Sequence, residues 1–141
     1  MRSIPDILKE SKTIAVVGLS NRPDRASHAV AAYLQQQGYR ILGVNPAYAG
    51  QDILGVPVFA SLAEAAATLE NGARIDIVDC FRTPDAMVPL ARDAIDIGAR
   101  CLWMQLGVIN EEAAGLARAA GLDVVMDRCM KIEHARAGRP A

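Results

Sequence analysis

The fold of this chain is decided by the stretch TIAVVGLSNRPDRAS, which covers Thr13–Ser27. Apolar and β-branched residues run up to Gly18, the residues that follow are mostly small, polar or basic, and a helical pattern begins near Ser27. This order is typical of the first strand of a doubly wound α/β domain, where free N–H groups and the positive end of a helix meet a phosphate. Arg22 and Arg25 add positive charge to that turn. The stretch therefore predicts a phosphorylated ligand without saying which one.

The same stretch departs from the usual dinucleotide-binding fingerprint. The pattern G-x-G-x-x-G would place glycine where this chain has Ser20 and Pro23. The second predicted strand, Arg40–Val44, ends in Asn45 and Pro46, where an NAD site would normally carry an acid for the ribose hydroxyls. Both departures count against a nicotinamide cofactor.

Length and composition indicate a single domain over the whole chain, with a sizeable core. The chain has 141 residues, of which 52% are apolar, and a formal net charge of −1, so bulk affinity for nucleic acid is not indicated. No apolar run approaches the ~18 residues of a membrane span, and the N-terminal residues lack a signal peptide's apolar segment. Cys80, Cys101 and Cys129 show no C-x-x-C spacing, as expected for reduced thiols. We therefore expect a cytoplasmic protein that binds no metal, nucleic acid or membrane.

Strand and helix patterns alternate along the chain, which predicts a parallel sheet with right-handed crossovers. The predicted strands are Thr13–Val17, Arg40–Val44, Val56–Phe59, Ile75–Cys80, Arg100–Met104 and Asp123–Met126. The predicted helices begin at Ser3, Ser27, Ser61, Thr83 and Asn110, and a last helical turn precedes a frayed tail over Ala135–Ala141. Six strands in two halves favour a Rossmann-type, doubly wound, three-layer sheet of order 3-2-1-4-5-6.

In such a sheet the ligand should lie across the carboxyl ends of the strands at the switch point. That rule selects the four loops 18–27, 45–48, 81–83 and 105–108. These loops hold no complete catalytic constellation, because Arg22 replaces the last glycine of G-x-S-x-G and neither His28 nor His134 is paired with a nucleophile. Asp79 and Asp127 lie near the same edge, where we expect them to pair with neighbouring arginines such as those at 82 and 128.

Several motifs occur together in this chain. They are Val17-Gly18-Leu19-Ser20 with Arg25 and Ser27, Gly38-Tyr39, Val44-Asn45-Pro46, Val78-Asp79 with Phe81-Arg82, Trp103–Val108 and Asp127–Met130. In combination they resemble the small stand-alone CoA-binding proteins, which are similar to the N-terminal CoA-binding domain of the succinyl-CoA synthetase alpha subunit. The resemblance covers roughly residues 4–134, nearly the whole chain.

The resemblance implies that the ligand is CoA or an acyl-CoA. By analogy, the first turn would hold the phosphates, Asn45-Pro46 would flank the nucleotide, and Phe81-Arg82 with Met104-Gln105 would line the opposite wall. Together with the arginines, the expected binding residues are Gly18, Leu19, Ser20, Arg22, Arg25, Ser27, Asn45, Pro46, Phe81, Arg82, Met104 and Gln105. CoA carries a diphosphate and a 3′-phosphate, and a site with several arginines and no ribose-binding acid suits it better than NAD.

The expected function is binding without catalysis. The chain ends where the synthetase's second domain, with its phosphorylated histidine, would begin, so no ligase activity is carried over. The resemblance is compatible with a homodimer. Two alternatives stay open: an NAD(P)-binding enzyme or redox sensor, and a regulatory or interaction module that has kept the fold and lost the ligand.

Overall fold

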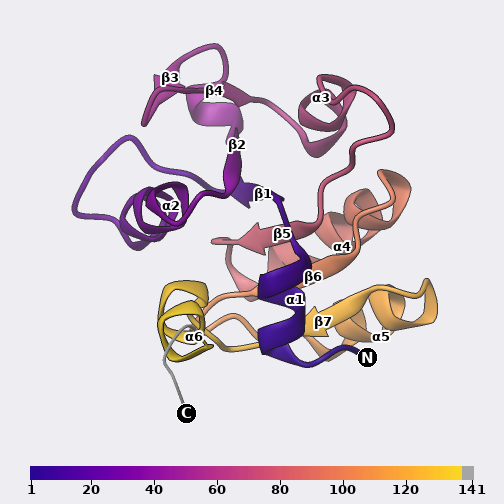
Figure 1. The fold of residues 1–141 in the computed structure, drawn as a ribbon. Coiled ribbons are helices and arrows are strands. Elements are labelled where there is room, and N and C mark those ends of the chain that lie inside the picture. Colours follow the sequence, from indigo (N-terminus) through magenta and orange to yellow (C-terminus); the bar gives the residue numbers. More distant parts are fainter. Residues whose placement is uncertain (138–141) are drawn as a thin grey trace.

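The computed structural model describes residues 1–137, and its centre is a seven-stranded sheet of order β3-β4-β2-β1-β5-β6-β7 (Figure 1). The strands are β1 (Thr13–Val17), β2 (Arg40–Val44), β3 (Asp52–Ile53), β4 (Val56–Phe59), β5 (Ile77–Cys80), β6 (Cys101–Met104) and β7 (Asp123–Val125). Neighbouring strands pair in parallel, except β3 and β4, which are antiparallel. The six predicted strands and their order are confirmed, and the short edge strand β3 was missed.

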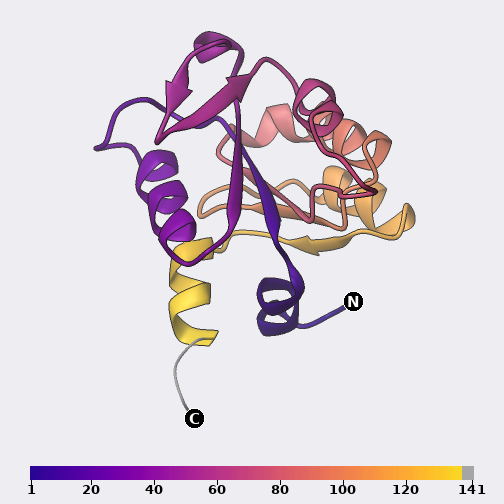
Figure 2. The same ribbon diagram turned by 45° about the horizontal axis from the view of Figure 1, so that its top comes forward.

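Helices cover both faces of this sheet (Figures 1 and 2). One face carries α1 (Ile4–Glu10), α2 (Ala26–Gln36) and α6 (Met130–Ala137), and the other carries α3 (Leu62–Ala67), α4 (Met87–Asp96) and α5 (Glu111–Ala119). Two short 3₁₀ turns, η1 (Pro46–Tyr48) and η2 (Pro84–Ala86), follow β2 and β5. Within residues 1–137, no helix has the length and apolar character needed to cross a bilayer. The doubly wound α/β class is confirmed.

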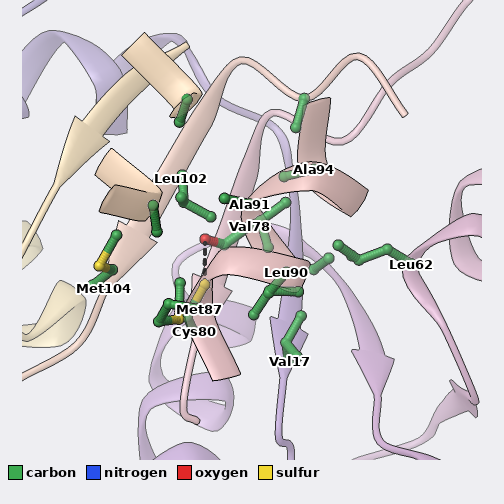
Figure 3. Close-up of a cluster of buried hydrophobic side chains, with 14 of the residues drawn as sticks. Val17, Leu62, Val78, Cys80, Met87, Leu90, Ala91, Ala94, Leu102 and Met104 are labelled. Carbon is green, nitrogen blue, oxygen red and sulfur yellow. Dashed lines mark hydrogen bonds between the residues drawn. The ribbon is translucent and has the colours of Figure 1, made fainter. Parts of the chain in front are cut away.

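The core has two parts because successive side chains of a strand point to opposite faces of the sheet. In β1, Ala15 and Val17 belong to the cluster under α3, α4 and α5, whereas Ile14 and Val16 belong to the cluster under α1, α2 and α6. Figure 3 shows the first cluster, in which α4 side chains pack on β5 and β6. Burial on both faces explains why the central strands are continuous apolar runs. The loops at the strand ends are therefore the parts of the sheet region that are open to a ligand.

Side-chain caps fix where three of the helices begin. The Ser3 and Ser61 hydroxyl oxygens accept hydrogen bonds from backbone N–H groups three residues later, each at 3.2 Å, and Asn110 Oδ1 accepts one from Ala113 N at 2.9 Å. These contacts confirm the three predicted helix starts. Thr83, in contrast, makes no capping hydrogen bond with its side chain, and the chain enters α4 through η2 instead.

The C-terminal helix α6 is longer than the sequence suggested. It runs to Ala137, so the prediction of a single turn and of fraying from Ala135 onward is wrong for residues 135–137; residues 138–141 lie outside the described residues. Tertiary contacts support it: His134 Nδ1 lies 2.9 Å from the Tyr33 hydroxyl of α2. At its start, Trp103 Nε1 donates to the carbonyl of Arg128 at 2.9 Å. Packing rather than local pattern therefore stabilises this helix.

Candidate functional site

The central strands end in one row at the carboxyl edge of the sheet. Val17 of β1 pairs with Val44 and with Cys80, and Cys80 pairs with Met104. The residues that follow these four therefore lie side by side, in the order Asn45, Gly18, Phe81 and Gln105. Each of these residues opens one of the four loops that the sequence selected. The loops thus start from neighbouring points on one edge.

Gly18 is required at this edge by the fold itself. Its φ is +91°, and a Cβ built on it would lie 2.4 Å from the carbonyl oxygen of Phe81. The neighbouring strand therefore already excludes a side chain, because such a contact with backbone cannot be relieved by a rotamer change. From the sequence, this glycine is expected to let a phosphate approach the backbone. The structure explains the glycine by the close contact with the Phe81 carbonyl, and the approach of a phosphate stays a prediction.

Hydrogen bonds within the first loop hold its shape. Ser27 Oγ accepts from Ser20 N at 3.0 Å, and Ser20 Oγ accepts from Arg22 N at 3.1 Å. Asn45 Nδ2 donates to the carbonyl of Leu19 at 3.1 Å, which ties this loop to the end of β2. In these contacts both serine hydroxyls act as acceptors, so each keeps its own O–H to donate to a ligand.

The first turn of α2 lies beside these serines and has no side-chain cap. The residue before the helix, Arg25, makes no capping hydrogen bond, and the first turn contains no acidic residue. The N–H groups of residues 26–28 precede the first intrahelical bond, which Ala29 N makes to the Arg25 carbonyl at 3.1 Å. They point, with the positive end of the helix dipole, toward any anion placed there.

A pocket of ≈ 410 Å³ lies over this turn. Its lining residues are Gly18, Ser20, Arg22, Arg25, Ala26, Ser27, Asn45, Tyr48 and Phe81. Its lining includes two arginines and no acid. Arg22 lies 3.5 Å from Asp24, but both side chains are largely exposed, so this pair leaves most of the arginine's attraction for a ligand. The pocket is suited to a phosphate or diphosphate group.

A second, mostly apolar pocket of ≈ 310 Å³ lies near the same strand ends, bordered by α3 and α4. It is lined by Val17, Val44, Pro46, Ala60, Ser61, Leu62, Arg82, Ala86, Pro89, Leu90 and Asp93. Val17 and Val44 line this pocket, and the residues after them, Gly18 and Asn45, line the first. The ends of β1 and β2 therefore separate a polar pocket from an apolar one.

The twelve residues predicted from the sequence divide into three groups. Those that line the first pocket are Gly18, Ser20, Arg22, Arg25, Ser27, Asn45 and Phe81. Pro46 and Arg82 line the second pocket instead. Leu19, Met104 and Gln105 are buried and line neither pocket, and Met104 belongs to the core cluster that α3, α4 and α5 cover (Figure 3).

Two lining residues were missed by the sequence argument, Ala26 and Tyr48. Tyr48 lies in η1, inside a loop that the switch-point rule had selected, so an aromatic residue in that loop was an available signal. Ala26 carries no distinctive chemistry, and only the position of the helix start places it at the pocket.

Asp79 lies buried below the row of strand ends. Its Oδ1 accepts from Gln105 Nε2 at 2.5 Å, and its Oδ2 has no hydrogen-bond partner among the described residues. Burial raises the pKa of this carboxyl to about 7, although the bond from Gln105 lowers it. The predicted pairing of edge acids with arginines is wrong here, because Asp79 forms no ion pair within residues 1–137 and Asp127 Oδ1 instead accepts from Gly107 N at 2.8 Å.

Comparison with known proteins identifies the family. A model described as "CoA binding domain" matches residues 12–135. The chain belongs to the CoA-binding domain family. It is 42% identical over 132 residues to the uncharacterized protein YneT of Bacillus subtilis (strain 168), which covers 94% of this chain and 92% of that protein.

Solved structures agree with this family and fold. The structure of cell-free ID.343 from Thermus thermophilus has 36% sequence identity and a TM-score of 0.85, with 94% of each chain covered. A dinucleotide-forming acetyl-coenzyme A synthetase from Ca. Korarchaeum cryptofilum has 17% identity and a TM-score of 0.66, and the match covers 85% of this chain and 27% of that one. This second likeness shows the fold alone. The resemblance noted from the sequence is confirmed.

Proposed function

We propose that this protein binds CoA or an acyl-CoA at the carboxyl edge of its sheet, with the ligand's phosphates at the start of α2. One observation carries the proposal: α2 begins without a side-chain cap or an early acid, beside two arginines and two serine hydroxyls. Free N–H groups at such a helix end, with guanidinium groups beside them, favour phosphate oxygens. Membership of the CoA-binding domain family supports the same ligand.

The parts of such a ligand meet different surfaces along the row of strand ends. The diphosphate lies in the polar pocket, and the adenosine lies toward the end of β2, where Pro46 and Tyr48 offer apolar surface. The pantetheine arm then leaves in the other direction, over Phe81 and the end of β5. This is the usual order of a nucleotide across the switch point of a doubly wound sheet.

Asn45 favours CoA over NAD at this site. Its Oδ1 accepts from Ala47 N at 3.0 Å and its Nδ2 donates to Leu19 O, so the amide is engaged by backbone. An NAD site would normally place a carboxylate at the end of β2 to bind the ribose hydroxyls. The arginines of the first loop suit a ligand with more phosphate groups.

Calorimetry with CoA, dephospho-CoA, NAD and NADP tests this assignment. Arg25→Ala should weaken CoA by about ten- to a hundredfold, because hydrogen bonds to charged groups contribute about 1.5–3 kcal/mol. Arg100→Ala, which removes an arginine from the opposite edge of the sheet, is the matched control and should leave the affinity unchanged. Dephospho-CoA should bind less tightly if an arginine meets the 3′-phosphate. Tighter binding of NAD than of CoA would contradict the proposal.

We also propose that the protein alone does not transform its ligand. Ser20 and His28 are not hydrogen-bonded to each other, and His134 contacts Tyr33 of α2 instead. The assay incubates the protein with acetyl-CoA or succinyl-CoA, with and without ATP and a carboxylic acid, and measures free thiol and phosphate. Release above the buffer rate that is lost in Arg25→Ala would overturn this proposal.

A further inference from the structure

The loop between β6 and α5 exposes two large apolar side chains beside the proposed site. Among the described residues, the exposed large apolar side chains are Met1 (81%), Leu106 (61%), Ile109 (50%) and Ile132 (46%). Single exposed side chains of this kind are ordinary. Leu106 and Ile109 differ because they share one loop, and that loop opens at the row of strand ends described above.

Hydrogen bonds hold this loop in place. Gly107 N donates to Asp127 Oδ1 at 2.8 Å, and Val108 N donates to the Gln105 carbonyl at 2.9 Å. At the far end, Asn110 Nδ2 donates to the carbonyl of Pro84 at 2.9 Å, and the Val108 side chain is buried in the core. The two exposed side chains are therefore presented on a fixed backbone, which lowers the entropy cost of binding.

With the ligand bound as proposed, the pantetheine arm is long enough to reach this loop. Gly18, Phe81 and Gln105 are successive positions in the row, so the loop lies two strand spacings, about 10 Å, from the phosphate turn. The pantetheine arm is about as long as the backbone of four amino-acid residues, which spans roughly 13 Å when extended. With the adenosine over β2 and the phosphates at α2, the arm runs across β5 and places its sulfur over β6.

We propose that Leu106 and Ile109 bind the apolar acyl chain of an acyl-CoA, so that the protein prefers apolar acyl-CoA esters to free CoA and to esters that carry a carboxylate. This inference rests on the proposed function and names the substrate class of that site. The loop Gln105–Asn110 contains no charged residue, and the carboxylate of Asp127, which accepts from Gly107 N of this loop, repels another carboxylate rather than pairing with it.

The test compares the affinities of CoA, succinyl-CoA and hexanoyl-CoA by calorimetry. Hexanoyl-CoA should bind about tenfold more tightly than CoA, because about half of its methylene surface is removed from water on an open patch. In the double variant Leu106→Gln, Ile109→Gln this ratio should fall to about one, and succinyl-CoA should show no gain in either protein. Ile132→Gln, which removes an exposed isoleucine on α6, is the matched control and should keep the ratio.

The outcomes separate this inference from the proposed function. If neither CoA nor hexanoyl-CoA binds, the proposed function fails and the inference fails with it. If CoA binds and hexanoyl-CoA binds no more tightly, or if the double variant keeps the tenfold ratio, the inference alone is overturned. Sedimentation of the parent protein and the double variant tests whether a second copy of the chain binds at this loop. If the parent is a dimer, the double variant is a monomer, and neither protein prefers acyl-CoA, the loop is a contact between copies and the inference is overturned.

Discussion

The two edges of the central sheet both carry a hollow lined by arginines. At the amino edge a pocket of ≈ 650 Å³ is bordered by Arg2, Arg74 and Arg100, whereas the pocket at the carboxyl edge measures ≈ 410 Å³ and is bordered by Arg22 and Arg25. Judged by volume and by the number of arginines, the amino edge would be the better site for an anion. The proposed site nevertheless lies at the carboxyl edge.

The direction of the helices explains the difference. The amino-edge pocket includes Gly98 and Gly121, which follow the C-terminal ends of α4 and α5, where the helix dipole carries partial negative charge. Arg2 there is already paired with Asp123 at 2.7 Å and with Glu10 at 2.8 Å. At the carboxyl edge, α2 contributes N–H groups instead. Counting arginines therefore does not locate an anion site; the orientation of the neighbouring helix decides.

The largest expected difference between the two edges concerns glycine. Gly18→Ala places a Cβ 2.4 Å from a backbone oxygen, whereas Gly121→Ala meets nothing within 4 Å, although both have positive φ. We expect Gly18→Ala to lose more than about 4 kcal/mol of unfolding free energy, and Gly121→Ala about 1 kcal/mol. Urea unfolding of both variants measures this. Equal losses would show that the contact with Phe81 is not what requires glycine at the carboxyl edge.

The buried carboxyl of Asp79, at the carboxyl edge, makes the free energy of unfolding depend on pH. Its pKa is about 7 in the folded protein and near 3.8 when unfolded, so its stabilising contribution is full below pH 4 and is lost as the pH rises through 7. That difference corresponds to about 4 kcal/mol between pH 4 and pH 8. Asp79→Asn should remove this part of the decline in unfolding free energy.

Urea titrations at several pH values supply the measurement. Asp127→Asn, at an exposed acid on the same edge, is the control and should decline with pH as the parent protein does. A parent protein whose stability does not fall between pH 4 and pH 8, relative to Asp79→Asn, would mean that the carboxyl finds a partner when ionised.

The smallest expected effect belongs to the amino edge. Arg2→Ala removes the half-buried contacts with Asp123 and Glu10, and we expect a loss of about 1 kcal/mol of unfolding free energy with no change in CoA affinity. Thermal unfolding and calorimetry of the same sample measure both quantities. Weaker CoA binding in Arg2→Ala would contradict the assignment of the CoA site to the carboxyl edge.

Much of the fold could be predicted because its signals are local. Continuous apolar runs gave the strands, and Ser3, Ser61 and Asn110 marked helix starts through contacts three residues away. The signal for the first loop of the site is also local, since its serines and arginines follow directly after the strand that ends before Gly18.

Other features depend on residues that are distant in the sequence. Buried Asp79 has its hydrogen-bond partner, Gln105, 26 residues away in the sequence. The length of α6 depends on contacts such as that of His134 with Tyr33, 101 residues away. The direction of Met104 into the core follows from strand alternation with Leu102, which faces the same cluster (Figure 3). Alternation along β6 therefore places Met104 in the core even though it is the last residue of the strand.

The hydrogen bond from Trp103 to the Arg128 carbonyl has a spectroscopic consequence. The chain contains one tryptophan, and its side chain is fully buried where β6 meets the segment leading into α6. Tryptophan emission, excited selectively over that of the three tyrosines, therefore comes from a single buried indole with one hydrogen bond to the backbone. A red shift of that emission will record separation of the C-terminal helix from the sheet, so the protein carries its own optical probe of this contact.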